Sequence, residues 1–139
     1  MRRSALVFLL TAAVATPAAA GDLTVTVKGV KNASGSVLGA VYDEAGFMQQ
    51  PKAKAVARAK AAPGAVALTF HNLPAGRFAV AVFHDANGDG KLAKNNLGVP
   101  TEGYGFSNDA QGSAGPPRFD QAAFAFDGHA KAVAIDLDY

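Results

Sequence analysis

The 139-residue chain contains no cysteine and no tryptophan, and the first of these absences excludes several classes of protein. Without cysteine there is no disulfide scaffold, no cysteine-based zinc site and no thiol nucleophile. Charged residues make up only 17% of the chain and hydrophobic residues 50%, which excludes a disordered protein. The length is enough for one domain with one core and too short for two.

Net charge is also scarce. The formal charge of +2 depends on Arg2 and Arg3, and without them 11 basic residues balance 11 acidic ones. Net charge therefore gives no indication of nucleic-acid binding. The charge is uneven along the chain, because residues 22–83 hold seven Lys or Arg against three Asp or Glu, whereas residues 84–139 hold four against eight.

The first 20 residues have the order of features of a secretory signal peptide. A cationic start at residues 1–3 precedes an apolar run at 5–14 and small residues at 18–20. That run is about half of the roughly 20 residues needed to cross a bilayer. The sequence predicts cleavage before Gly21, and a single periplasmic or secreted domain of residues 21–139 with no membrane span.

Alternating apolar and polar side chains indicate strands along most of residues 21–139. Leu23, Val25 and Val27 alternate with polar residues, and this period of two is typical of a strand with one buried face. Other segments suggest strands at 35–42, 66–71, 77–84, 122–126 and 133–138. About seven short strands with no convincing amphipathic helix predict an all-β fold, an antiparallel β-sandwich of the immunoglobulin or transthyretin type.

Residues 52–60 are ambiguous, because their alanines and lysines have high helix propensity. Lys54, Val56, Arg58 and Lys60 nevertheless alternate with alanine. We predict a short edge strand whose basic side chains hinder edge-to-edge pairing. The alternative is a basic patch for a membrane or nucleic acid.

Residues 85–117 form a long segment without sustained periodicity, which holds seven of the 15 glycines and three of the 7 prolines. Loops of this length in compact domains are usually functional or disordered. Apolar residues such as Leu92, Tyr104 and Phe106 can pack the segment down. We therefore expect one long ordered loop, and we expect the function of the protein there.

The loop opens with a pattern typical of a calcium ligand set. Asp85, Asn87 and Asp89 place oxygen side chains at alternate positions, and Gly90 follows as in the first half of an EF-hand loop. The twelfth position is Asn96 instead of glutamate, so a calcium site would need Glu102 or Asp109 folded back, or waters. The alternative is a turn held by side-chain-to-backbone hydrogen bonds.

Catalytic patterns are weaker. His84, Asp85 and Ser107 could form a nucleophile and base, but no Gly-x-Ser-x-Gly motif surrounds the serine. Asp85, Asp89 and Glu102 could supply a glycosidase acid pair. A small sandwich without tryptophan offers a poor sugar cleft, so we expect no enzyme.

Three stretches carry a family resemblance: NLPAGRFAVAVFHDANGDGKL at 72–92, LGVPTEGYGFSN at 97–108 and GPPRF at 115–119. With the Gly-Phe pair at 46–47, they resemble the bacterial exported family catalogued as domain of unknown function 2141, over about residues 23–139. That family is uncharacterised, so the resemblance implies a small exported sandwich and no activity. Family members often carry an acidic residue where this chain has Ala93, which removes one cation ligand. The turn and strand at 73–78 also look like transthyretin-like modules, which serve as binding or structural modules.

These observations predict an exported, non-enzymatic binding or structural module whose 85–117 loop contacts an envelope protein or a small ligand. One alternative is a calcium-stabilised adhesion-type module, with calcium as the candidate cofactor. The other is a small hydrolase that uses His84 and the acidic loop residues.

Overall fold

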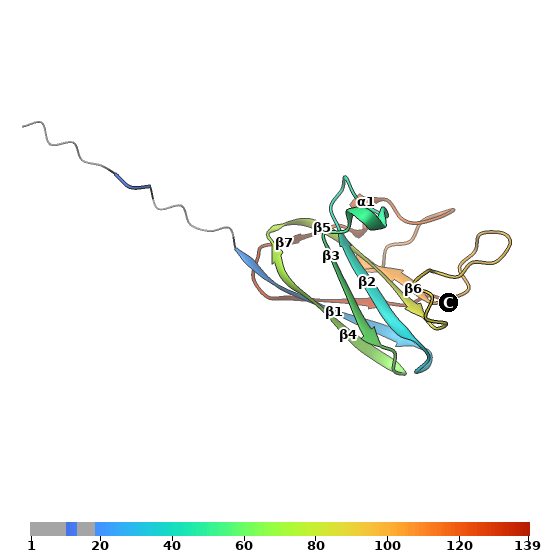
Figure 1. Ribbon diagram of the computed structural model, residues 1–139. Coiled ribbons are helices and arrows are strands. Elements are labelled where there is room, and N and C mark those ends of the chain that lie inside the picture. The colour runs from blue at the N-terminus through green and yellow to red at the C-terminus, as the bar shows by residue number, and fades with distance from the viewer. Residues whose placement is uncertain (1–10, 14–18) are drawn as a thin grey trace, which may run out of the picture.

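A computed structural model describes residues 11–13 and 19–139, so most of the predicted leader at 1–20 lies outside the described residues. Eight strands form two sheets that pack as a sandwich (Figure 1). The predicted all-β sandwich is confirmed, with eight strands in place of about seven. The point of predicted cleavage, before Gly21, lies one residue after the start of the first strand.

The smaller sheet has the order β4-β1-β8. Strand β1 pairs antiparallel with β4 and parallel with β8. Because β1 and β8 lie at opposite ends of the sequence, no local pattern could have predicted this one parallel pair. The strands are β1 (Ala20–Val30), β4 (Gly64–Pro74) and β8 (Lys131–Asp136).

The larger sheet has the order β3-β2-β5-β6, and β7 pairs with β5 beside β6. The strand β2 is central, and β3 is an edge strand, as the alternation within residues 52–60 predicted. Within residues 52–60 only the second part is strand, because a 3-10 turn occupies Gln50–Lys52. The strands are β2 (Ser36–Tyr42), β3 (Ala55–Lys60), β5 (Gly76–Asp85), β6 (Tyr104–Phe106) and β7 (Phe124–Phe126).

Two expectations about irregular segments need correction. Segment 85–117 contains β6 and a 3-10 turn at Ser107–Asp109, so it is not one continuous loop. Ala122 ends a short helix, α1 (Phe119–Ala122), and the strand that was expected at 122–126 begins at Phe124. Strands of three residues are too short to produce a period that can be distinguished from chance.

Side chains from both sheets fill the space between them. Leu23, Val25 and Val27 of β1 face this core, as their alternation predicted. On β5, Phe78, Val80 and Val82 point into the core, while Ala79 points to the outer face. There a second cluster forms with Phe106, Phe119 and Ala122, which explains why β5 is apolar on both sides. No helix in the described part of the chain could cross a membrane.

Candidate functional site

The predicted cation loop is a tight turn that begins where β5 ends. The buried Asp85 accepts hydrogen bonds from the backbone of Gly88 at its Oδ1 (3.1 Å) and of Gly90 at its Oδ2 (2.8 Å). Both glycines have positive φ angles, 74° and 75°, which other residues rarely adopt. The sequence pattern therefore fixes a turn in which one carboxylate organises five residues.

Asn87 and Asp89, the next two residues of the turn with oxygen side chains, also accept hydrogen bonds from backbone N–H groups. The side chain of Asn87 accepts a hydrogen bond from the N–H of Asp89 (3.1 Å), and Asp89 accepts one from the N–H of Lys91 (2.9 Å). These are side-chain-to-backbone bonds of the kind that the turn interpretation requires. The oxygens remain available for a further ligand, since a carboxylate can accept about four bonds.

Glu102, which comes later in the same segment, adds a third carboxylate to the site. Its Oε2 accepts the N–H of Ala86 (2.7 Å) and its Oε1 the N–H of Ala93 (3.0 Å). The carboxylate is buried, so these two charge-assisted bonds replace its contact with water. Glu102 thus ties together the start of the loop, its middle and the strand β6 that follows.

Carboxylate oxygens of Asp85, Asp89 and Glu102 lie within 4.8 Å of one another. Hard cations such as calcium prefer oxygen ligands of this kind. Of the two residues that the sequence offered as a fourth ligand, Glu102 folds back to the loop. Asp109 does not, because its Oδ1 accepts the N–H of Asp136 (2.9 Å). Asn96 lies exposed at the far end of the loop.

Residues 93–101 form a hairpin that protrudes beyond the strands at the right of Figure 1. The side chain of Asn95 accepts hydrogen bonds from the N–H groups of Leu97 (2.9 Å) and Val99 (3.1 Å). The backbone adds bonds from Asn95 N to Val99 O (2.9 Å) and from Thr101 N to Ala93 O (2.8 Å). The tip is therefore ordered, although Leu97 is 88% and Val99 54% exposed. Sequence reasoning did not single out Asn95.

The candidate hydrolase residues are not brought together as a nucleophile and base. The Nε2 of His84 lies 2.7 Å from the carbonyl of Ser34, and its Nδ1 lies 3.0 Å from the hydroxyl of Tyr139. The hydroxyl of Ser107 accepts the N–H of Val80 (2.9 Å) and donates to the carbonyl of Ala122. Both side chains are buried, and each is held by its own partners. These bonds give His84 and Ser107 structural roles.

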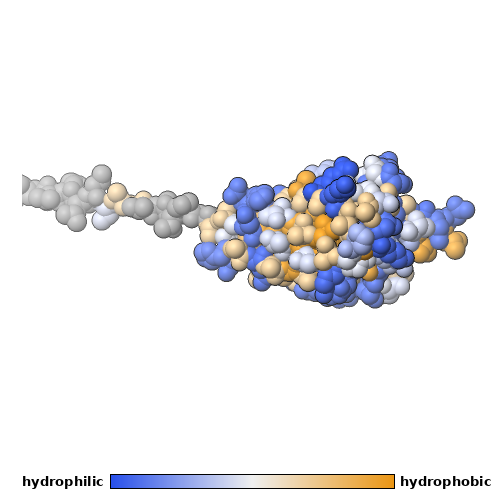
Figure 2. Space-filling model, turned by 90° about the horizontal axis from the view of Figure 1, so that it is seen from below, coloured by the Kyte–Doolittle hydropathy of each residue, from blue (hydrophilic) through white to orange (hydrophobic). Residues whose placement is uncertain are grey.

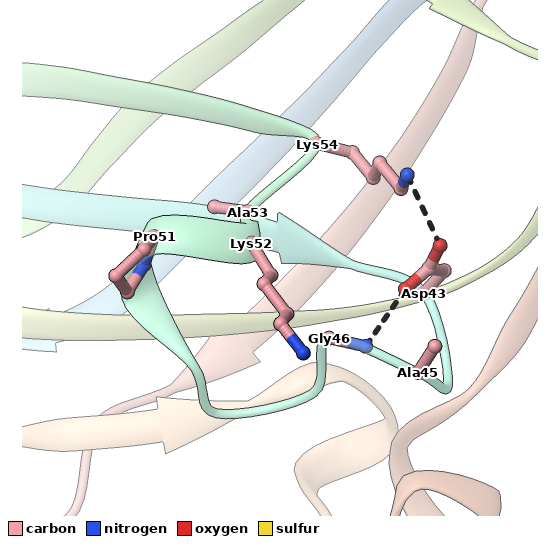
Figure 3. A pocket seen from close by; sticks show the side chains of 7 residues that line it. All are labelled: Asp43, Ala45, Gly46, Pro51, Lys52, Ala53 and Lys54. Atoms are coloured by element: carbon pink, nitrogen blue, oxygen red, sulfur yellow. Dashed lines mark hydrogen bonds and ion pairs between the residues drawn. The ribbon is translucent and has the colours of Figure 1, made fainter.

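An open hollow of about 320 Å³ lies beside the turn after β2 (Figure 3). Lys52 and Lys54 point toward this turn, and Lys54 pairs with Asp43 (3.2 Å). Asp43 also accepts the N–H of Gly46 (2.9 Å). The bond from Gly46 and the nearby Lys54 ammonium lower the pKa of the Asp43 carboxyl below its ordinary value. The hollow has no second acidic group, and it is lined by Asp43, Ala45, Gly46, Pro51, Lys52, Ala53 and Lys54.

A second hollow, of about 220 Å³, lies beside β6 and the end of the chain. Its carboxylates belong to Asp109, Asp136 and Asp138. The side chain of Gln111 donates to Asp138 (3.2 Å), and Asp109 is bonded to the backbone of Asp136. The carboxylate of Asp136 pairs with Lys28 of β1 (3.5 Å), so all three acidic groups hold segments of the chain together.

Comparison with known proteins agrees with the resemblance seen in the sequence. The model of a bacterial family described as "Uncharacterized protein conserved in bacteria (DUF2141)" matches residues 25–134. This range includes the six strands β2 to β7 whole, residues 25–30 of β1 and residues 131–134 of β8, together with the Asp85 turn and the hairpin. No curated protein and no solved structure matches the chain significantly. The chain belongs to the bacterial DUF2141 family.

Proposed function

We propose that this protein is an exported, non-enzymatic binding or structural module that contacts an envelope component through residues 85–117. The ordered hairpin at 93–101 carries this proposal. Its hydrogen bonds hold the side chains of Leu97 and Val99 exposed to water on a segment that projects beyond the strands. A partner that covers these two side chains would remove apolar surface from water, which favours association.

The base of the hairpin supports the same proposal. Glu102 accepts one hydrogen bond from the N–H of Ala86, near the start of segment 85–117, and one from the N–H of Ala93, where the hairpin begins. A loop that is already ordered loses little conformational entropy when it binds. The separate bonding of His84 and Ser107 supports a role without catalysis by these groups.

Export is part of the proposal, and the predicted leader supports it. We expect the protein from envelope extracts to begin at Gly21, which intact-mass analysis measures directly. Retention of Met1 or Arg2 in that material would contradict the predicted cleavage.

The binding role can be tested by co-purification from the envelope fraction. The full chain is compared with a variant in which Gly-Gly replaces residues 95–99, and thermal unfolding verifies that both are folded. A matched control shortens another exposed segment in the same way, at residues 62–65, where the connection from β3 meets the start of β4. We expect a protein, lipid or small ligand that is recovered with the wild type and the control to be lost with the hairpin variant. Equal recovery in all three would refute the proposal.

A calcium-stabilised adhesion-type module is the second candidate, favoured by the convergence of Asp85, Asp89 and Glu102. A cation there would neutralise carboxylates that otherwise repel one another. It would brace the base of the same hairpin. A calcium-dependent rise in melting temperature tests this candidate.

A further inference from the structure

We propose that the hairpin at residues 93–101 docks on the surface of a lipid bilayer that carries anionic headgroups. The inference rests on the proposed function, because it names the partner of the same loop. Leu97 and Val99 would enter the boundary between headgroups and acyl chains. Lys91 and Lys94 would contact the headgroups.

The apolar part of the argument is the exposure of the tip. Leu97, at 88%, is more exposed than any other large apolar side chain in the described part of the chain. Val99 lies two residues away and is 54% exposed. At the right-hand end of Figure 2, apolar groups protrude beyond the body of the molecule beside hydrophilic ones. Burying such side chains in the interface of a membrane removes them from water.

The hairpin at 93–101 carries one charged side chain, Lys94, while the carboxylates of Asp85, Asp89 and Glu102 gather at its base. Between residues 90 and 101 the charged side chains are Lys91 and Lys94, which are exposed and form no ion pair among the described residues. Of the carboxylates that flank these residues, Glu102 is buried and bonded to two N–H groups, whereas Asp89 is exposed and accepts the N–H of Lys91. Basic residues beside an apolar tip complement an anionic lipid surface.

The shape of the hairpin favours a bilayer over a protein pocket. A tip that protrudes as a rigid projection needs a matching cavity in a protein partner, whereas a bilayer accepts it without one. The Asn95 side chain holds the two apolar residues on the same short turn by bonds to both of their N–H groups. They can therefore enter the bilayer without the loop first having to order.

The absence of tryptophan from the chain allows a direct test. Leu97→Trp places the sole indole of the protein at the tip. Val56→Trp places it on β3, where Val56 is 75% exposed beside Lys54 and Arg58. Both proteins are produced from the full coding sequence, so any effect of the N-terminus is shared. We expect Leu97→Trp to show a blue shift with vesicles of equal parts phosphatidylglycerol and phosphatidylethanolamine, and Val56→Trp to show none.

Sedimentation with the same vesicles measures how strongly the wild type and each variant partition onto the bilayer. Two side chains anchor less strongly than one acyl chain, whose partition constant is on the order of 10⁴ M⁻¹, so lipid at roughly millimolar concentration is required. Leu97→Ser with Val99→Ser should lower partitioning by at least about tenfold. Each of Lys91→Gln and Lys94→Gln should lower it about fivefold. Val56→Ser should leave it unchanged.

Three results would overturn the inference. The first is the absence of a blue shift of Leu97→Trp with the vesicles that contain phosphatidylglycerol. The second is a blue shift of equal size with vesicles of phosphatidylcholine alone. The third is hairpin-dependent recovery of an envelope protein by a chain that binds no vesicles, which would leave the proposed binding function intact. Failure of both vesicle binding and hairpin-dependent co-purification would refute the two together.

Discussion

The imidazole of His84 and the hydroxyl of Tyr139 join the end of strand β5 to the last residue of the chain. The ring Nδ1 and the hydroxyl oxygen are 3.0 Å apart, and the Lys31 N–H donates to the same hydroxyl (3.0 Å). The carbonyl of Ser34 can only accept, so Nε2 of His84 carries a proton and, in the neutral ring, Nδ1 accepts from Tyr139. These bonds hold the C-terminus at the end of the sandwich from which the hairpin protrudes (Figure 1).

Removal of this hydroxyl should destabilise the fold. Tyr139→Phe leaves the buried Nδ1 of His84 without its partner, which costs about 1–3 kcal/mol. The hydroxyl of Tyr104 makes no hydrogen bond among the described residues, so Tyr104→Phe should stay within about 0.5 kcal/mol. Urea denaturation of the three proteins measures both differences. An equal midpoint for Tyr139→Phe and the wild type would show that the bond contributes nothing.

A glycine provides an independent test of the same contact. A Cβ at Gly103 would lie 2.5 Å from Cζ of the Tyr139 ring. Gly103→Ala should therefore displace the ring and reproduce the loss seen with Tyr139→Phe. When the two changes are combined, the second should add little, because both remove one interaction.

Much of the fold could be predicted because the sandwich buries one face of most strands. The alternation at Leu23, Val25 and Val27 follows from that arrangement, and so does the exposure of Val56, Arg58 and Lys60 on β3. The parallel contact of β1 with β8 could not be predicted. It depends on long-range packing that leaves no periodic trace in either strand.

The candidate site was predictable only where its residues are neighbours in sequence. The spacing of Asp85, Asn87 and Asp89 identified the turn. The choice between Glu102 and Asp109 required the structure, because β6 decides which of them returns to the loop. Likewise the partners of His84 come from residues 50 and 55 positions away, so its structural role has no local signal.

The core offers a simple stability comparison. Phe78 on β5 is buried between the sheets, and Phe78→Ala should cost about 3–5 kcal/mol of a total stability of about 5–15 kcal/mol. Thr24 is on the outer face of β1, and Thr24→Ala should change stability by about 0.5 kcal/mol or less. Chemical denaturation gives both values. Similar midpoints for the two variants would contradict the assignment of Phe78 to the core.

The hydrogen bond that Asp43 accepts from Gly46, together with its ion pair with Lys54, should make stability depend on pH. The fold lowers the pKa of the Asp43 carboxyl, so the charged form is the stabilised one. Its contribution is complete above the ordinary aspartate pKa of about 3.9. It is lost as pH falls through the lower value of the folded protein.

Asp43→Asn isolates this contribution, because asparagine can still accept the N–H of Gly46 while it loses the charge. We expect the variant to unfold at lower denaturant concentration than the wild type at pH 7, and the difference to disappear as pH falls below about 4. Glu44→Gln changes the adjacent carboxylate, which accepts no hydrogen bond in the described part of the chain. A difference for Asp43→Asn that is constant from pH 7 to strongly acidic pH would contradict the linkage.

The turn at Asp85 should reveal whether calcium binds. If Asp85, Asp89 and Glu102 share a cation, binding raises stability by RT ln(1 + [L]/Kd), about 2.7 kcal/mol at a hundredfold excess over Kd. With three carboxylates, and Asn96 at the twelfth position, we expect Kd on the order of 10⁻⁴–10⁻³ M. Millimolar calcium should then raise the melting temperature of the wild type. Magnesium should do less, because it gives up its water shell reluctantly.

Substitutions at Asp89 and Asp85 distinguish cation binding from the hydrogen bonds of the turn itself. Asp89→Ala removes one carboxylate of the group, so its melting temperature should not respond to calcium. Asp127→Ala removes an aspartate from another turn, where it accepts the N–H of His129 (2.8 Å), and the calcium response should remain. Asp85→Ala should cost about 1–3 kcal/mol even in chelator, because the N–H groups of Gly88 and Gly90 lose their acceptor. Equal wild-type melting temperatures in chelator and in calcium would exclude the calcium site and leave Asp85 as the organiser of a turn.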